Sequence, residues 1–148
     1  MTADYILRPA IADDFPRIRG LIRSVKINPM GLDWRRFIVA VTPDEELIGC
    51  GQVKPHGDGT LELSSIAVIP ERRGQGIART IIEHLLSEYP GELYLTCRSS
   101  LAPLYRKFGF IPVQSSEMPP YFRRLHKAAA AIGMFFPNDE YLLVMKKM

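Results

Sequence analysis

The first half of the chain combines one helical pattern with several strand-like runs. Apolar residues between Asp13 and Val25 recur at intervals of three and four, which predicts an amphipathic helix. The runs rich in β-branched and apolar residues that predict strands are 5–8, 36–41, 47–53 and 62–68. The second and third runs flank Thr42-Pro43-Asp44-Glu45, whose residues favour a turn. We therefore expect these two strands to form a hairpin.

The second half of the chain alternates strands with helices. Residues 75–88 place Ile77, Ile81 and Leu85 on one face and predict a second amphipathic helix. The remaining elements that we expect are strands at 93–97, 110–113 and 141–145, a short helix at 101–108, and a helix at 121–131 inside an inserted segment, 115–139. An antiparallel first half followed by strand-helix-strand units predicts a mixed, mostly antiparallel α/β (α+β) sheet of about seven strands with helices on both faces.

Composition limits the classes of protein to consider. The 148 residues are 47% hydrophobic and 24% charged, which fits one globular domain over residues 1–148. The net charge of +3 suits an anionic small ligand and predicts no nucleic-acid partner. No apolar run approaches the roughly 20 residues that span a bilayer, and Met1-Thr2-Ala3-Asp4 lacks the features of a signal peptide. These observations predict a cytoplasmic protein with no membrane partner.

The cysteines and histidines predict no metal site. Cys50 and Cys97 lie in apolar runs that read as strands, so we expect buried, reduced thiols rather than a disulfide, a metal site or a nucleophile. The three histidines, His56, His84 and His126, have no spacing that suggests shared ligands. We expect them to be surface residues.

The segment from Val68 to Arg79 passes from a strand through a glycine-containing turn into the second helix. Gly74 and Gly76 allow a tight turn and a close approach of the backbone to a ligand. The first amides of the helix have no partner inside it, and the helix dipole is positive at that end. With Arg73 and Arg79 nearby, this turn predicts a site for a pyrophosphate. The alternative is an ordinary solvated turn.

Two other nucleotide-binding motifs do not fit this turn. A P-loop requires Gly-Lys-Ser/Thr, which does not follow Gly76. The dinucleotide motif requires a third glycine, where this chain has Arg79.

Arg73-Gly74-Gln75-Gly76-Ile77-Ala78 resembles the Arg/Gln-x-x-Gly-x-Gly/Ala signature of the GNAT superfamily of N-acetyltransferases. Leu104-Tyr105-Arg106-Lys107-Phe108-Gly109-Phe110 is similar to that family's Tyr-x-Lys-x-Gly-Phe segment. Two such segments in the right order are a specific signal, although the motifs cover only residues 62–110. The resemblance implies the GNAT-like sheet, with a bulge in the fourth strand and a splay between the fourth and fifth strands.

The resemblance also implies acetyl-CoA as co-substrate and positions that would bind it. Pantetheine would lie in the splay, against Ile66, Ala67 and Val68 on one side and 93–97 on the other. The backbone amides of Gly74, Gln75, Gly76, Ile77, Ala78 and Arg79 would bind the pyrophosphate, with the charge of Arg73 nearby. An amide near Val68 would face the thioester carbonyl as an oxyanion donor. Relatives often have an asparagine before the short helix, and here Ser99 and Ser100 would replace it.

Two side chains are candidates for proton transfer under this resemblance. Glu62 stands where some members of the family place the general base that deprotonates the amine. The alternatives are a solvated glutamate and a water held by Ser64 or Ser65. Tyr105 corresponds to the tyrosine that many relatives direct at the coenzyme sulfur, where it would assist the leaving thiolate. The alternative role of Tyr105 is that of an aromatic residue that packs on Phe108 and Phe110.

The expected reaction is direct transfer of an acetyl group from acetyl-CoA to a primary amine in a ternary complex. The acceptor, a small molecule or a peptide, would enter near 28–34 and 115–136. The inserted segment, with Tyr121, Phe122, Met134 and Phe135, would cap an apolar pocket, form a homodimer or cover the sheet. The rival function is a non-catalytic acyl-CoA-sensing module of the same fold.

Overall fold

Four strands form the sheet of a first unit, which comprises residues 1–54 and 63–88. The computed structural model describes residues 4–131 and 140–148. The strands are β1 (Ile6–Pro9), β2 (Phe37–Val41), β3 (Leu47–Pro55) and β4 (Leu61–Val68), the last of which begins in the second unit. β2 pairs antiparallel with both β1 and β3, and β4 is the other neighbour of β3.

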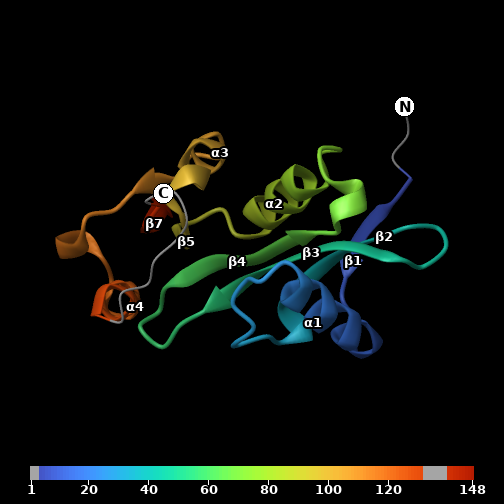
Figure 1. The fold of residues 1–148 in the computed structure, drawn as a ribbon, viewed down its shortest axis with the longest axis horizontal. Helices are drawn as coiled ribbons and strands as arrows, with labels where there is room; N and C mark the ends of the chain where they lie inside the picture. Colours follow the sequence, from blue (N-terminus) through green and yellow to red (C-terminus); the bar gives the residue numbers. More distant parts are fainter. Residues whose placement is uncertain (1–3, 132–139) are drawn as a thin grey trace. The chain divides into compact units, whose positions relative to one another are not determined.

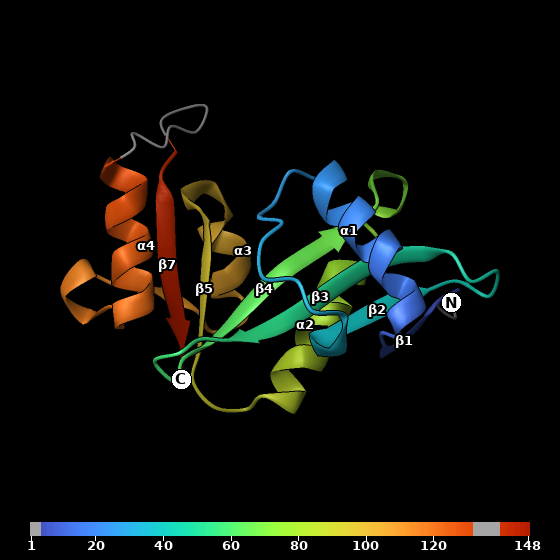
Figure 2. The same ribbon diagram turned by 90° about the horizontal axis from the view of Figure 1, so that it is seen from below.

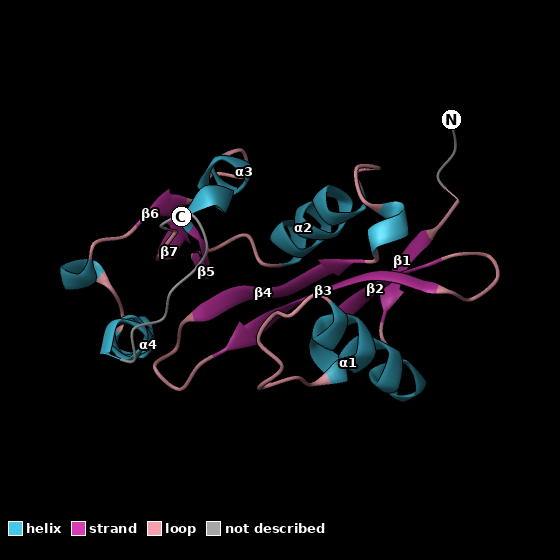
Figure 3. Ribbon diagram, viewed as in Figure 1, coloured by secondary structure: helices cyan, strands magenta, loops and turns pink. Residues whose placement is uncertain are grey.

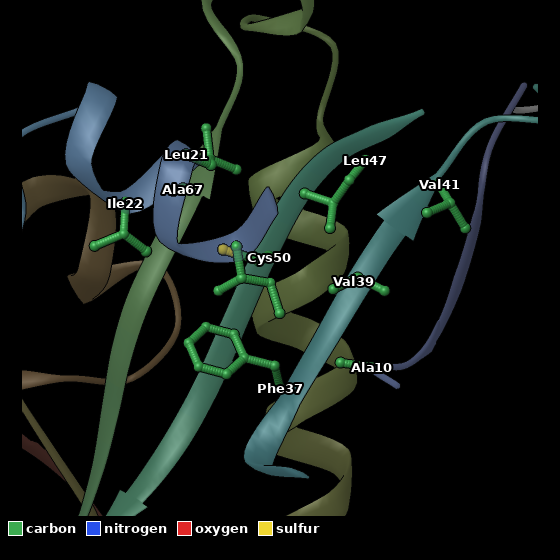
Figure 4. Close-up of a cluster of buried hydrophobic side chains, with 10 residues drawn as sticks. Ala10, Leu21, Ile22, Phe37, Val39, Val41, Leu47, Cys50 and Ala67 are labelled. Carbon is green, nitrogen blue, oxygen red and sulfur yellow. The ribbon is translucent and has the colours of Figure 1, made fainter. Parts of the chain in front are cut away.

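Helices α1 (Phe15–Ser24) and α2 (Ile77–Glu88) cover opposite faces of this first sheet (Figures 1 and 2). The apolar stripe of α1 buries Ile18, Leu21 and Ile22 against strand residues that include Phe37 and Cys50 (Figure 4). Each such side chain contributes about 1.5–3 kcal/mol when it is fully buried. α2 buries Ile77, Ile81 and Leu85 in the same manner. The residues that the helical spacing placed on one face of each helix are thus the ones that pack on the sheet.

Glycine in β3 allows α2 to approach the sheet closely. A Cβ atom at Gly51 would lie 2.6 Å from Ile66 Cδ1 and 2.8 Å from Ile81 Cγ2. A side chain there would therefore push the helix away from the strands. The side chain of Gln52, one position later, points to the α1 face.

The second unit comprises residues 55–62 and 89–148. Its elements are β5 (Leu93–Arg98), α3 (Ala102–Arg106), β6 (Ile111–Pro112), α4 (Pro120–Ala131) and β7 (Leu142–Lys147) (Figure 3). β7 lies between β5 and β6 and is antiparallel to both. Tyr94, Phe122 and Val144 form part of an apolar cluster beneath α4.

The predicted fold class is confirmed. The described residues form seven strands in the order β1-β2-β3-β4-β5-β7-β6, with both antiparallel and parallel pairs. β4 and β5 pair in parallel at one register position, Glu62 opposite Tyr94, and both residues belong to the second unit. β6 comprises only Ile111–Pro112 and is shorter than predicted, although Val113 N–H still donates to Val144 O of β7 at 2.9 Å. Met134 and Phe135 lie outside the described residues.

None of the helices in the described part of the chain is long and apolar enough to cross a membrane.

Candidate functional site

The turn between β4 and α2 presents free backbone donors in the first unit. Gly74 and Gly76 have φ angles of 78° and 81°, a region that favours glycine. The first hydrogen bond of the helix, of 3.0 Å, runs from Thr80 N–H to Gly76 O. The amides of Ile77, Ala78 and Arg79 therefore have no acceptor within the helix. These are the donors that an anion at the helix N-terminus would use.

A hollow of about 110 Å³ lies at this turn. Its lining residues are Val68, Arg72, Arg73, Gly74, Gly76, Ile77, Ala78 and Arg79. Nε of Arg73 donates to Val68 O at 3.3 Å, which leaves the rest of the guanidinium for another acceptor. Gln75 does not line the hollow, and its Oε1 accepts a bond of 3.0 Å from Arg72 Nε. Arg79 forms an exposed ion pair with Glu83 at 2.8 Å.

β4 carries a backbone irregularity at Ser65. This residue has a φ of 60°, which is uncommon for a residue with a Cβ atom. Its hydroxyl accepts a hydrogen bond of 2.8 Å from Gln52 Nε2, and its carbonyl accepts one of 3.5 Å from the Cys50 thiol. Surrounding contacts thus hold the unusual conformation, as is typical of functional strand distortions. The bulge expected in this strand stays a prediction.

The three residues after Ser65 have different surroundings. Ile66 approaches Gly51 on the α2 face. Ala67 is buried in the apolar cluster beneath α1 (Figure 4), and Val68 lines the hollow. Their role in binding pantetheine remains a prediction.

Glu62 is buried at the start of β4, in the second unit. The residue is 5% exposed, and its Oε1 lies 2.8 Å from His56 Nε2. The side chain of His56 is itself only 8% exposed. A buried carboxylate paired with an imidazole can exchange a proton with a third group, whereas a solvated glutamate has no such partner. The expectation that His56 lies on the surface was therefore wrong.

Aromatic contacts and a hydrogen bond fix the position of His56. Its ring stacks on Tyr121 with 3.6 Å between centroids and meets the edge of Phe122 at 5.6 Å. Asp58 Oδ2 accepts the backbone N–H of Tyr121 at 3.0 Å, which ties the turn after β3 to the start of α4. Burial, followed by the charge of Glu62, raises the pKa of Tyr121. This contact could not be predicted from local sequence patterns, because residues 56 and 121 are far apart in the chain.

Tyr105 lies on α3 in the second unit and is partly buried. Its ring meets the edge of Phe110 at 6.3 Å, so the expected packing partner is present. Burial, together with the nearby Cys97 thiol, raises the pKa of Tyr105 to about 12. The hydroxyl consequently stays protonated at physiological pH and remains a hydrogen-bond donor.

Ser99 and Ser100 precede α3 and are tied to the segment that leads into β7. Ser99 Oγ accepts the backbone N–H of Tyr141 at 3.2 Å, and Ser100 N–H donates to Glu140 Oε1 at 3.2 Å. The hydroxyl of Ser99 therefore already has a structural partner. Contact of either serine with the coenzyme stays a prediction.

The two cysteines are buried free thiols, as predicted. Burial raises the pKa of Cys50 to about 12 and that of Cys97 to about 11. Both are therefore thiols rather than thiolates at neutral pH, which makes them poor nucleophiles. Within residues 4–131 and 140–148, no group of three or more His, Cys, Asp or Glu side chains is arranged to hold a metal ion.

The fold and the glycine turn define the class of protein. The model of the acetyltransferase (GNAT) domain family matches residues 33–112, which is more than half of the chain. The chain therefore belongs to the GNAT acetyltransferase family. The matched region includes the turn after β4 as well as Glu62 and Tyr105.

Solved structures support the same fold. N-acetylglutamate synthase from Neisseria gonorrhoeae, complexed with coenzyme A and N-acetyl-glutamate, is similar with a TM-score of 0.76 and 18% identity over 99% of this chain. This chain spans only 35% of that protein. Rv2747 from Mycobacterium tuberculosis, in complex with CoA, has a TM-score of 0.71 and 20% identity, covering 97% of this chain and 98% of that one. A nourseothricin acetyltransferase has a TM-score of 0.63 and 22% identity over 98% of both chains. No curated protein sequence matches the chain.

Proposed function

We propose that this protein is an N-acetyltransferase that moves an acetyl group from acetyl-CoA to a primary amine. The observation that carries the proposal is the group of unpaired amides at Ile77, Ala78 and Arg79, behind two glycines in left-handed conformation. Such donors bind a diphosphate, which coenzyme A supplies. Two similar structures contain coenzyme A, which supports the same cofactor here.

The residues that surround the turn fit an anionic coenzyme. The guanidinium of Arg73 borders the hollow, and its free N–H groups would pair with the diphosphate. The unusual backbone conformation at Ser65 supports a binding site for pantetheine along β4, where an irregular strand can offer backbone groups to a ligand. An amide near Val68 would then donate to the thioester carbonyl as its charge develops.

The transfer is proposed to be direct. The neutral amine attacks the thioester carbonyl, the new C–N bond forms, and the C–S bond breaks with its electron pair leaving on sulfur. The protein then needs to accept one proton from the amine and to stabilise one thiolate. The raised pKa values of Cys50 and Cys97 argue against an acyl-cysteine intermediate.

Glu62 is the proposed general base, and His56 is its positioning residue. Their hydrogen bond fixes one carboxylate oxygen and leaves the other to accept the proton of the amine. The stacked ring of Tyr121 keeps the imidazole in place. A water held by Ser64 or Ser65 is the alternative base.

Tyr105 is proposed to stabilise the leaving thiolate. Its pKa of about 12 lies well above the value of about 8.5 of an ordinary thiol, so complete proton transfer to the thiolate would be uphill. A hydrogen bond from the hydroxyl would stabilise the departing sulfur without that cost. Solvent would protonate the thiol afterwards.

Thiol release from acetyl-CoA tests the proposal. The acceptors are a panel of amino acids, polyamines, aminoglycosides and peptide N-termini, and calorimetry measures the binding of the coenzyme separately. We expect binding of acetyl-CoA and release of thiol that depends on one class of amine. Binding without turnover on the whole panel would favour the acyl-CoA-sensing module, and no binding at all would refute both functions.

A further inference from the structure

Lys54, near the end of β3, is a buried cation without a carboxylate partner. The residue is 8% exposed, and its Nζ donates one hydrogen bond, of 3.2 Å, to Met30 O. An ammonium group carries three donors. The ion pairs among the described residues do not include Lys54. Burying an unpaired charge is costly, so this position fits a ligand that brings the opposite charge.

Gln52 adds a second unmet polar group on the same face of β3. Its Nε2 donates to Ser65 Oγ at 2.8 Å, while its Oε1 is buried and has no hydrogen-bond partner among the described residues. Assigning the amide oxygen and nitrogen of Gln52 the other way round would not remove the unmet group, because the nitrogen would then be buried without an acceptor. Residues two positions apart in a strand point to the same side, so Gln52 and Lys54 share one face.

This face is the one covered by α1 and the loop that follows it. A Cβ atom at Gly31 would lie 3.2 Å from Lys54 Nζ, so the ammonium sits directly beneath that loop. α2, which follows the proposed diphosphate turn, packs on the other face against Gly51. The anion that would pair with the Lys54 ammonium is therefore not the diphosphate. The loop at 28–34 is also one of the two segments near which the resemblance implied that the acceptor enters.

We propose that Lys54 binds a carboxylate of the acceptor and that the acceptor is a free amino acid. A single buried ammonium matches the single negative charge of a carboxylate better than a doubly charged phosphate. Gln52 Oε1 would accept an N–H of the same molecule, which an amino acid provides close to its carboxylate. This inference rests on the proposed function, because it names the acceptor class of that reaction.

Matched acceptor pairs test the inference. Thiol release from acetyl-CoA is measured with L-glutamate, L-glutamine, L-arginine and L-alanine, and with the α-amide and decarboxylated amine of each. We expect kcat/KM for at least one acid to exceed that of its two counterparts without the α-carboxylate by about 100-fold. In Lys54→Met the KM for that acid rises by about the same factor, while the counterparts change less than about threefold. Two outcomes would overturn the inference. One is that the wild-type protein uses the counterparts as well as the acid, and the other is that Lys54→Met loses activity equally with the acid and with its counterparts.

Stability measurements distinguish a ligand-binding role of Lys54 from a structural one. If Lys54 serves binding, Lys54→Met removes an unpaired buried charge. The midpoint of thermal unfolding should then stay unchanged or rise, and the affinity for coenzyme A should stay the same. Lys127→Met, which removes an exposed lysine of α4, is the matched control. A midpoint that falls in Lys54→Met but not in Lys127→Met would show that Lys54 serves the fold instead.

Binding separates this inference from the proposed function. The CoA-saturated protein is titrated calorimetrically with the same amino acids. A heat of binding that is measured with the wild-type protein and is absent in Lys54→Met supports the carboxylate site. This holds even if no thiol is released with any amine. No heat and no turnover with any amino acid, while other amines react, would overturn the carboxylate site and leave the acetyltransferase intact.

Discussion

His56 Nε2 lies 2.8 Å from Glu62 Oε1, and both side chains are buried. The pair spans the turn between β3 and β4, so a local hairpin fixes its geometry. A second pair of the same kind, His84 with Glu88, lies exposed on α2. The chain thus contains a matched control for both members of the buried pair.

Glu62→Gln is expected to lower kcat by about 10²–10⁴-fold, because the amide cannot accept the proton of the amine. Steady-state kinetics with saturating acetyl-CoA measure this loss, and Glu88→Gln should behave as wild type. A Glu62→Gln variant that keeps the wild-type kcat would exclude Glu62 as the base and favour the water held by Ser64 or Ser65.

His56→Gln should lose less activity than His56→Ala, because the glutamine amide can still donate a hydrogen bond to Glu62. In both variants kcat should fall while the affinity for acetyl-CoA, measured by calorimetry, stays constant. His84→Ala is the control. Equal losses in the two His56 variants would contradict a positioning role based on this hydrogen bond.

Tyr105→Phe should lower kcat by about 10–100-fold and weaken coenzyme binding far less. Because the pKa of Tyr105 is raised to about 12, the hydroxyl keeps its proton up to about pH 10. The ratio of wild-type to variant kcat should therefore be constant between pH 6 and 10. A ratio that falls towards 1 as the pH rises through 8–9 would show that the hydroxyl titrates in that range.

Arg73→Glu should weaken the binding of coenzyme A by at least about tenfold, because the new carboxylate faces the diphosphate. The loss should shrink as salt is added, since screening weakens the repulsion. Calorimetry at 50 and 500 mM salt measures this, with Arg23→Glu on the exposed side of α1 as control. Unchanged affinity in Arg73→Glu would place the diphosphate elsewhere.

Asp14→Asn should lower the free energy of unfolding by about 3 kcal/mol at pH 7. The buried Asp14 carboxylate accepts hydrogen bonds from Arg8, Arg17 and the amide of Ile11, at 2.7–3.1 Å. The bond from Arg8, the largest cause, lowers the pKa of Asp14. Its stabilisation is therefore complete above the unfolded-state value of about 3.9 and is lost as the pH falls through the lower native value.

Urea titrations at pH 7 and pH 3 check this prediction. The difference between wild type and Asp14→Asn should be smaller at pH 3. The exposed neighbour Asp13 provides the control variant, Asp13→Asn, which should change stability very little.

Most elements of the fold could be predicted because hydrophobic periodicity records which side of an element is buried. The stripe of Ile18, Leu21 and Ile22 on α1, for instance, is the side that the structure buries. The position of β7 between β5 and β6 could not be predicted in this way, because the hydrophobic periodicity of a strand contains no information on which strands lie beside it. Short elements were placed least well, as with the two-residue β6.

The candidate site was predicted in part. Gly74 and Gly76 could be found because their backbone conformation requires glycine, which leaves a visible trace in the sequence. The pairing of His56 with Glu62 left no such trace, since a histidine beside a turn looks the same whether or not an aromatic ring from α4 covers it. Lys54 likewise reads as an ordinary polar residue of a strand.

The place of β7 has a consequence for the order in which the chain folds. As the polypeptide emerges from the ribosome, the strands and helices of the first unit are complete once residue 88 has appeared. β5 and β6 must then wait for residues 142–147 before they can be joined. We therefore expect the first unit to acquire structure during translation, whereas the second acquires it only when synthesis of its last strand ends.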